Sequence, residues 1–154
     1  MAAQDCDRIT LIRTATLADA EAAVRTLRRS ITELCVADHQ NEAGKLEPWL
    51  RNKTVADWAN WLERDDAVVF VAERDGEVVG VGATALRGEI LLNYVHPDAR
   101  FAGVSKAMLA ALEAVLRGQG VARSRLKSTV TARAFYEGRG YIPDASGECL
   151  GKDL

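Results

Sequence analysis

The chain has 154 residues, of which 48% are hydrophobic and 27% charged, so we expect one domain over 1–154 with a packed core. Its net charge of −2 argues against bulk nucleic-acid binding, and its apolar runs fall short of the roughly 20 residues of a membrane span. The stretch MAAQDCDR lacks the basic and apolar segments of a secretory signal. We therefore expect a cytoplasmic protein that binds neither nucleic acid nor membrane.

The first part of the chain is expected to be one strand followed by helices. Thr16 opens a capping signature, and Thr54 is a second candidate helix cap. The expected elements are a strand over 8–15, helices over 16–30 and 31–39, a loop over 41–45, and a helical region over 47–64.

The second part alternates strands and helices. We expect three antiparallel strands over 67–97 with turns at 74–77 and 86–89, a helix over 103–117, a strand over 122–129, a short helix over 131–141, and a last strand from 141–142 that returns near 148–150. The segment 89–128 then forms a parallel, right-handed crossover. The fold class is mixed α/β, with a largely antiparallel central sheet and helices on both faces.

Cysteine and histidine residues show no pattern that predicts a disulfide or a metal site. Cys6, Cys35 and Cys149 are odd in number and far apart, and His39 and His96 lack metal-ligand spacing. We expect reduced thiols and no metal. None of the cysteines has the helix-start or basic setting of a nucleophile.

The turn before the central helix is unusually small. Ala102, Gly103 and Ser105 leave room at a helix N-terminus, whose free N–H groups and dipole favour a phosphate, and Arg100 and Lys106 add positive charge. An ordinary tight turn that needs a glycine fits the same residues equally well. A dinucleotide-binding turn is disfavoured because the preceding strands are antiparallel and GxGxxG is absent.

Two segments resemble the GNAT superfamily of N-acetyltransferases. The first reads Arg100-Phe101-Ala102-Gly103-Val104-Ser105, against the family's Arg/Gln-x-x-Gly-x-Gly/Ala. The second is Ala132-Arg133-Ala134-Phe135-Tyr136-Glu137-Gly138-Arg139-Gly140-Tyr141, a close match to Ala-x-x-Phe/Leu-Tyr-x-x-x-Gly-Phe/Tyr. Ser105 and Thr129 depart from the family, which usually has Gly or Ala and often Asn there. The resemblance covers 67–142 well.

The resemblance implies a bulged strand before the turn, with the turn wrapped around the pyrophosphate of acyl-CoA. The pantetheine would pair with the backbone of that strand, where a freed N–H can stabilise the oxyanion. The implied cofactor-binding residues are Asn93, Tyr94, Val95, Arg100, Phe101, Ala102, Gly103, Val104, Ser105, Lys106, Thr129 and Tyr136.

Two residues are candidates for proton transfer. Tyr136 matches the family's general acid, and a phenol with a pKa near 10 is protonated at neutral pH. It would otherwise be a core tyrosine. Glu89 resembles the base of the family's histone acetyltransferases, and in an unbulged strand it would share a face with Leu91 and Asn93. It could equally be a solvated charge. Glu33 and Asp38 are weaker candidates, and many members of the family use ordered water as the base instead.

The implied function is transfer of an acetyl group from acetyl-CoA to a primary amine of a small molecule or peptide, by direct attack in a ternary complex. The family places the substrate wall in 30–62, which contains His39, Trp49, Trp58 and Trp61, although Trp58 and Trp61 have the spacing of helix-packing residues. A homodimer is possible. The alternative is a non-catalytic acyl-CoA sensor or interaction module on the same fold.

Overall fold

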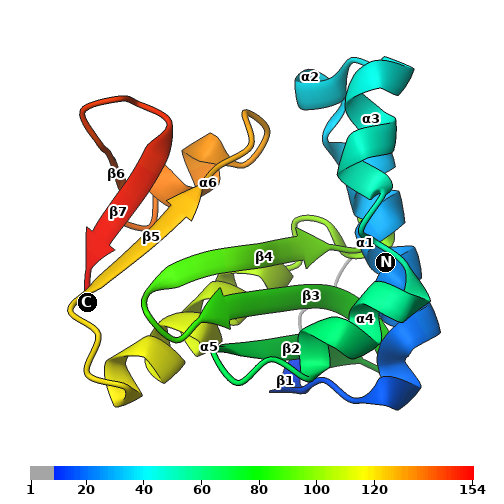
Figure 1. Ribbon diagram of the computed structural model, residues 1–154, viewed down its shortest axis with the longest axis horizontal. Helices are drawn as coiled ribbons and strands as arrows, with labels where there is room; N and C mark the ends of the chain where they lie inside the picture. Colours follow the sequence, from blue (N-terminus) through cyan, green and yellow to red (C-terminus); the bar gives the residue numbers. More distant parts are fainter. Residues whose placement is uncertain (1–8) are drawn as a thin grey trace, which may run out of the picture.

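The protein, described over residues 9–154 by a computed structural model, has a seven-stranded sheet with helices on both faces (Figure 1). The sheet order is β1-β2-β3-β4-β5-β7-β6. The strands are β1 (Leu11–Thr14), β2 (Ala67–Arg74), β3 (Glu77–Ala85), β4 (Glu89–Val95), β5 (Arg123–Lys127), β6 (Ile142–Pro143) and β7 (Cys149–Asp153). Among the strands of residues 9–154, only β4 and β5 pair in parallel, which confirms the predicted parallel pairing and the mixed sheet.

The helices follow the predicted order with several shifted boundaries. They are η2 (Leu17–Asp19), α1 (Ala20–Leu34), α2 (Val36–His39), α3 (Ala43–Leu50), α4 (Val55–Leu62), η3 (Pro97–Ala99), α5 (Val104–Gly118) and α6 (Arg133–Glu137). Within residues 9–154, no helix is long and apolar enough to cross a membrane. The interpretation of MAAQDCDR, the start of the first strand at Arg8 and the state of Cys6 fall on residues 1–8, outside the described part of the chain.

Two boundary predictions were wrong. The predicted loop over 41–45 is cut short because α3 begins at Ala43, and the helical region 47–64 is interrupted between Leu50 and Val55. Thr54 does cap α4, since its side chain accepts a hydrogen bond from the Asp57 N–H at 3.2 Å. The turn between Leu50 and Val55, with Thr54 as the cap of α4, therefore divides one expected helix into two.

A separate hydrophobic core covers each face of the sheet. On one face, Leu27 of α1 and Trp58 of α4 pack with Val71 and Val81. On the other, α5 contributes its apolar side chains, including Met108, which lies where a Cβ of Gly82 would be. Trp58 is completely buried, and its indole N–H donates to the Thr16 carbonyl at 3.0 Å, so the packing interpretation of Trp58 is confirmed.

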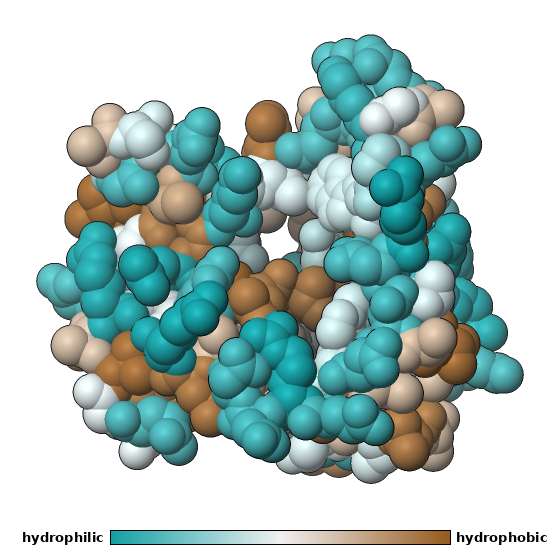
Figure 2. All heavy atoms as spheres, viewed as in Figure 1, coloured by the Kyte–Doolittle hydropathy of each residue, from teal (hydrophilic) through white to brown (hydrophobic). Residues whose placement is uncertain are grey.

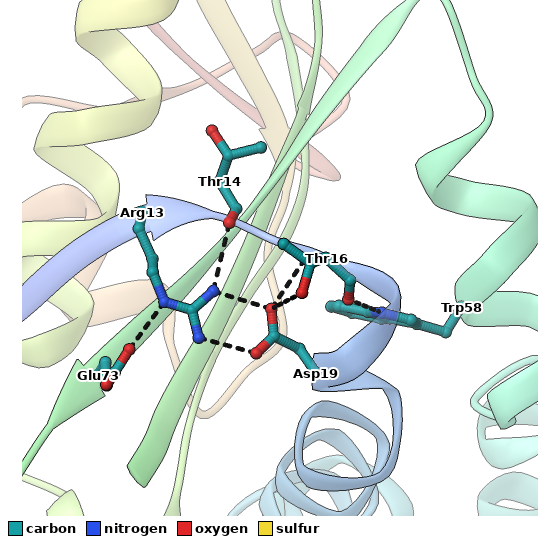
Figure 3. A network of polar contacts seen from close by, with 6 residues as sticks. All are labelled: Arg13, Thr14, Thr16, Asp19, Trp58 and Glu73. Atoms are coloured by element: carbon teal, nitrogen blue, oxygen red, sulfur yellow. Dashed lines mark hydrogen bonds and ion pairs between the residues drawn. The ribbon is translucent and has the colours of Figure 1, made fainter. Parts of the chain in front are cut away.

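An ion-pair network fixes the start of α1 against the sheet (Figure 3). The Arg13 guanidinium on β1 donates to both oxygens of Asp19, at 2.9 and 2.8 Å, and to Glu73 on β2 at 2.7 Å. Asp19 also accepts from the Thr16 N–H at 2.8 Å, which closes the predicted capping signature. The hydrogen bonds from Arg13 hold the pKa of Asp19 below its ordinary value.

Candidate active site

The site begins where β4 and β5 separate. These strands pair only at Glu89–Arg125 and Ile90–Leu126, and beyond that point they diverge toward α1 and α6 (Figure 1). On its other edge, β4 changes register with β3, because Ala83 pairs with Leu92 and Thr84 pairs with Ile90. Leu91 is therefore an extra, bulged residue. The bulged strand before the turn is confirmed, and its free edge faces the opening.

A main cleft of about 460 Å³ fills this opening. One side of the cleft is formed by β4 and by the turn and first residues of α5. The segment from Leu126 to Ala132, together with α6, forms the opposite side. Ser30 and Leu34 of α1, and Cys35 just after it, close the end. Figure 2 shows the hollow between the part that carries α6 and the part that carries α1 and α3, with hydrophobic atoms along its floor. The cleft thus reaches from the start of α5 to the end of α1.

The turn before α5 is open to the main cleft. Gly103 is the N-cap of α5 and has a left-handed φ of 79°. Apart from Gly103 and its two chain neighbours, no atom of the described chain lies within 4 Å of where its Cβ would be. No side chain caps the helix, so its first N–H groups remain available to an anion. Arg100, Phe101, Val104, Ser105 and Lys106 also line the cleft, whereas Ala102 does not.

Phe101 has an unusual conformation in this turn. Its φ is 65°, in the left-handed region, and 91% of the residue is exposed. The Arg100 guanidinium lies 4.6 Å from the centre of the ring. A cation over an aromatic face is weakly stabilising at an exposed site, so the two side chains hold each other at the mouth of the cleft.

Tyr136 lines the opposite wall of the main cleft and is only 6% exposed. Burial raises the pKa of its phenol to about 12, and interaction with the Asn93 amide partly offsets that rise. The ring is fixed by edge-to-face contacts with Phe135 and Tyr141, whose centroids lie 5.1 and 5.6 Å away. Tyr136 therefore carries its proton throughout the neutral range.

Asn93 joins the turn to this tyrosine. Its side-chain Nδ2 donates to the Ser105 carbonyl at 3.4 Å, while its Oδ1 is buried and has no hydrogen-bond partner among the described residues. The sequence resemblance gave Asn93 a role only through its backbone. The position of its side chain depends on the bulge at Leu91, which no local pattern in the sequence reveals.

The three candidate carboxylate bases lie outside the main cleft. Glu89 lies at the start of β4 and pairs with Arg87 at 3.3 Å. It does not share a face with Asn93, because Leu91 and Leu92 both pack toward α1 and α4, whereas Asn93 contacts α5. The shared face was expected for an unbulged strand, and the bulge at Leu91 removes that condition because it reverses the alternation of the strand.

Glu33 and Asp38 are engaged elsewhere. Glu33 pairs with Arg29 at 2.7 Å on the outer part of α1. Asp38 on α2 accepts hydrogen bonds from the Val130 N–H at 2.6 Å and from the Thr131 N–H and hydroxyl at 3.2 and 2.7 Å. Asp38 thus ties α2 to the loop before α6, across the end of the cleft.

Two of the expected cofactor contacts, Thr129 and Tyr94, line the main cleft, and their hydroxyl groups already accept hydrogen bonds from other residues of the protein. The Thr129 hydroxyl accepts from the Ala132 N–H at 3.0 Å. The Tyr94 hydroxyl accepts from the Trp49 indole N–H at 3.3 Å, and burial raises the pKa of Tyr94 to about 12. Trp49 does not line the main cleft itself, but its hydrogen bond holds the Tyr94 side chain in place.

Two further residues of the region 30–62, Cys35 and His39, have different surroundings: Cys35 lines the main cleft, whereas His39 is completely buried. Cys35 lines the cleft, and burial raises the pKa of its thiol to about 11, which keeps it protonated and unreactive at neutral pH. His39 is completely buried, with its Nε2 2.8 Å from the Ile31 carbonyl and its Nδ1 accepting from the Asn41 N–H at 3.0 Å. Its hydrogen bonds hold the end of α1 against α2.

Comparison with known proteins agrees with this geometry. A family model described as an acetyltransferase (GNAT) domain matches residues 35–152. A GCN5-related N-acetyltransferase from Rhodopseudomonas palustris has a TM-score of 0.83 at 24% identity, over 94% of this chain and 95% of that one. The PaiA N-acetyltransferase from Thermoplasma acidophilum, solved with coenzyme A, has a TM-score of 0.82 at 21% identity, over 95% and 99%.

A third solved structure is more distant. It is an Escherichia coli N-acetyltransferase named for an alanine of a ribosomal protein, with a TM-score of 0.68 at 19% identity, over 95% of this chain and 94% of that one. No curated protein matches the sequence. The TM-scores establish a shared fold, and the family model covers most of the chain. The chain belongs to the GNAT acetyltransferase family.

Proposed function

We propose that this protein transfers an acetyl group from acetyl-CoA to a primary amine of a small molecule or peptide. The observation that carries the proposal is the uncapped start of α5 at Gly103, which opens into a cleft that Tyr136 also lines. A pyrophosphate can accept hydrogen bonds from the free N–H groups there, and Arg100 and Lys106 add positive charge. The family and the CoA complex of the Thermoplasma acidophilum protein support this choice of donor.

The acyl chain would run along the free edge of β4. From Asn93 to Val95 this strand has no partner on the β5 side, so its backbone groups can pair with the amides of pantetheine. A backbone N–H of the same edge would stabilise the oxyanion that forms on the thioester carbonyl. Ser105, Thr129 and the rest of the turn then complete the cofactor site.

The transfer needs a base for the amine and a proton for the leaving thiolate. An alkylammonium loses one proton to become the free amine, which attacks the thioester carbon and forms a C–N bond. The nitrogen then gives up a second proton, which replaces the one that Tyr136 donates, and the C–S bond breaks. Tyr136 donates a proton to the departing thiolate, since its phenol is protonated at neutral pH. No Asp, Glu or His lines the main cleft in the described chain, so we propose ordered water as the proton acceptor, with Glu89 as the residue to test beside it.

The lack of an Asp, Glu or His among the described residues that line the main cleft also favours a second candidate function, a non-catalytic acyl-CoA-binding module. The two are separated by measuring thiol release from acetyl-CoA over a panel of primary amines, with CoA binding followed by calorimetry. Amine-dependent thiol release supports the transferase. Binding of acetyl-CoA without thiol release from any amine supports the module. The single domain, the homodimer and the cytoplasmic location stay predictions.

A further inference from the structure

A smaller cavity of about 210 Å³, here called the Lys53 cavity, lies beside the bulge of β4. Leu91 and Leu92 line both this cavity and the main cleft, so the two hollows share the bulged strand as a wall. Trp61 of α4 and the aliphatic residues of β2 and β3 complete its apolar part. The cavity is therefore on the α1 and α4 side of the sheet, away from α5.

Lys53 brings a charge into this apolar setting. The residue is 6% exposed, and within the described chain its ammonium donates hydrogen bonds to two neutral oxygens, Asn52 Oδ1 at 2.5 Å and the Trp49 carbonyl at 3.5 Å. No carboxylate in the described chain lies within ion-pair distance of it. An ammonium has three donors, so one remains for a further acceptor.

The other charged groups around the cavity are already compensated. Arg64 donates to both oxygens of Asp66, at 2.8 and 3.0 Å, and Glu89 also acts on it electrostatically. Asp57 is the carboxylate that interacts electrostatically with Lys53, and it accepts a hydrogen bond from the Thr54 hydroxyl at 2.7 Å. A buried charge without a counterion is costly, so Lys53 is the group that gains most from an incoming anion.

The apolar walls restrict the kind of anion. The Trp61 ring lies 5.7 Å from the Lys53 ammonium, and the two leucines offer no hydrogen bonds to a fully hydrated, multiply charged ion. One positive charge beside an apolar surface is complementary to an organic carboxylate with a hydrocarbon part. A second cation at this place would be repelled by Lys53, which excludes the far amine of a polyamine.

We propose that the Lys53 cavity receives the carboxylate of the acceptor, so that the preferred substrates are amines that also carry a carboxylate, such as amino acids. The hydrocarbon part would lie on Leu91 and Leu92 while the amine reaches the thioester at the β4 edge. This inference rests on the proposed transferase function, since it names the substrate class for the same site.

The test compares acceptors of matched shape, a carboxylate with its amide: 4-aminobutanoate with 4-aminobutanamide, and leucine with leucinamide. Each kcat/KM is expressed per free amine, because an amide in place of the carboxylate lowers the pKa of the amine. We expect the wild type to favour the carboxylate by at least tenfold in kcat/KM in one of the pairs. Lys53→Met, which keeps the length of the stem, should remove the preference while the amides react within twofold of wild type. Lys53→Arg should retain it, and Lys45→Met on exposed α3 is the control that should change nothing.

Equal rates for carboxylate and amide in both pairs of wild-type assays would overturn the proposal, and so would a preference that survives in Lys53→Met. The wild-type comparison needs no variant to fold. A second measurement is independent of catalysis: calorimetric titration of the CoA complex with 4-methylpentanoate and its amide. If no amine releases thiol, the proposed transferase function fails. Tighter binding of 4-methylpentanoate to the wild type than to Lys53→Met would then still support a carboxylate site in the Lys53 cavity. Equal or undetectable binding overturns it.

Discussion

The turn at Gly103 predicts that a single added methyl group blocks coenzyme binding without unfolding the protein. Gly103 has a φ of 79°, and its Cβ position is free of protein atoms within 4 Å, so Gly103→Ala directs the methyl group into the open cleft. The left-handed conformation costs alanine about 1 kcal/mol, which lowers Tm by roughly 2–4 °C for a chain of this size. Valine would add further strain, so alanine is the cleaner change.

The effect on binding should be much larger than the effect on folding. Hydrogen bonds from N–H groups to a charged phosphate contribute about 1.5–3 kcal/mol each. Losing one raises the Kd for CoA by at least about tenfold, and losing two by about 100-fold or more. Isothermal titration calorimetry with CoA and thermal unfolding of the same samples measure both effects.

The same helix provides a matched control. Gly120, just beyond the other end of α5, has a φ of 75° and also has no protein atom near its Cβ position. Gly120→Ala should lose as much stability as Gly103→Ala and keep wild-type affinity for CoA. Wild-type affinity in a folded Gly103→Ala protein would refute the phosphate role of the turn. An equal loss of affinity in both variants would assign the effect to strain.

Three other predictions concern the proton donor and the stability of the fold. Tyr136→Phe should lower kcat by at least about tenfold in the thiol-release assay, with the Kd for CoA little changed; a normal kcat would make Tyr136 a packing residue. Asp19→Asn removes a charge that faces Arg13 and should cost about 2 kcal/mol in urea unfolding, with unchanged CoA affinity; a loss below about 0.5 kcal/mol would contradict the network in Figure 3. Burial raises the pKa values of Tyr94 and Tyr136 from 10.0 to about 12, so the folded state holds these protons more tightly than the unfolded state. The free energy of unfolding should therefore fall as the pH rises from about 10 to about 12, by at most roughly 2.7 kcal/mol for each tyrosine. Urea unfolding at several pH values, with Tyr136→Phe showing a shallower fall, checks this, and a flat profile would contradict the burial of these phenols.

Local patterns in the sequence predict much of the scaffold. The hairpin turn at 74–77, the helix from Gly103 and the small residues before it depend on neighbours in the chain, and the structure contains them. The parallel pairing of β4 with β5 follows from chain direction and crossover length. These features bring Gly103 and Tyr136 to one cleft, as the resemblance to the family implied.

The remaining features depend on contacts between distant residues. One extra residue at Leu91 changes which face the following side chains of β4 occupy, so simple alternation counted from Glu89 does not give the face of Asn93. Asp38 contacts Val130, 92 positions away, and no spacing rule predicts that contact. Lys53 resembles any surface lysine in the sequence, and only the three-dimensional structure shows that it is buried beside Trp61.

The central claim is that acetyl-CoA and a primary amine react directly in the main cleft. The most direct measurement is the ratio of N-acetylated product, determined by mass spectrometry with isotope-labelled acetyl-CoA, to thiol released in the same reaction. The account predicts one labelled amide for each thiol, with both reduced together in Tyr136→Phe and Gly103→Ala. Thiol release without amide, or acetyl-CoA binding with neither product for every amine tested, would contradict it.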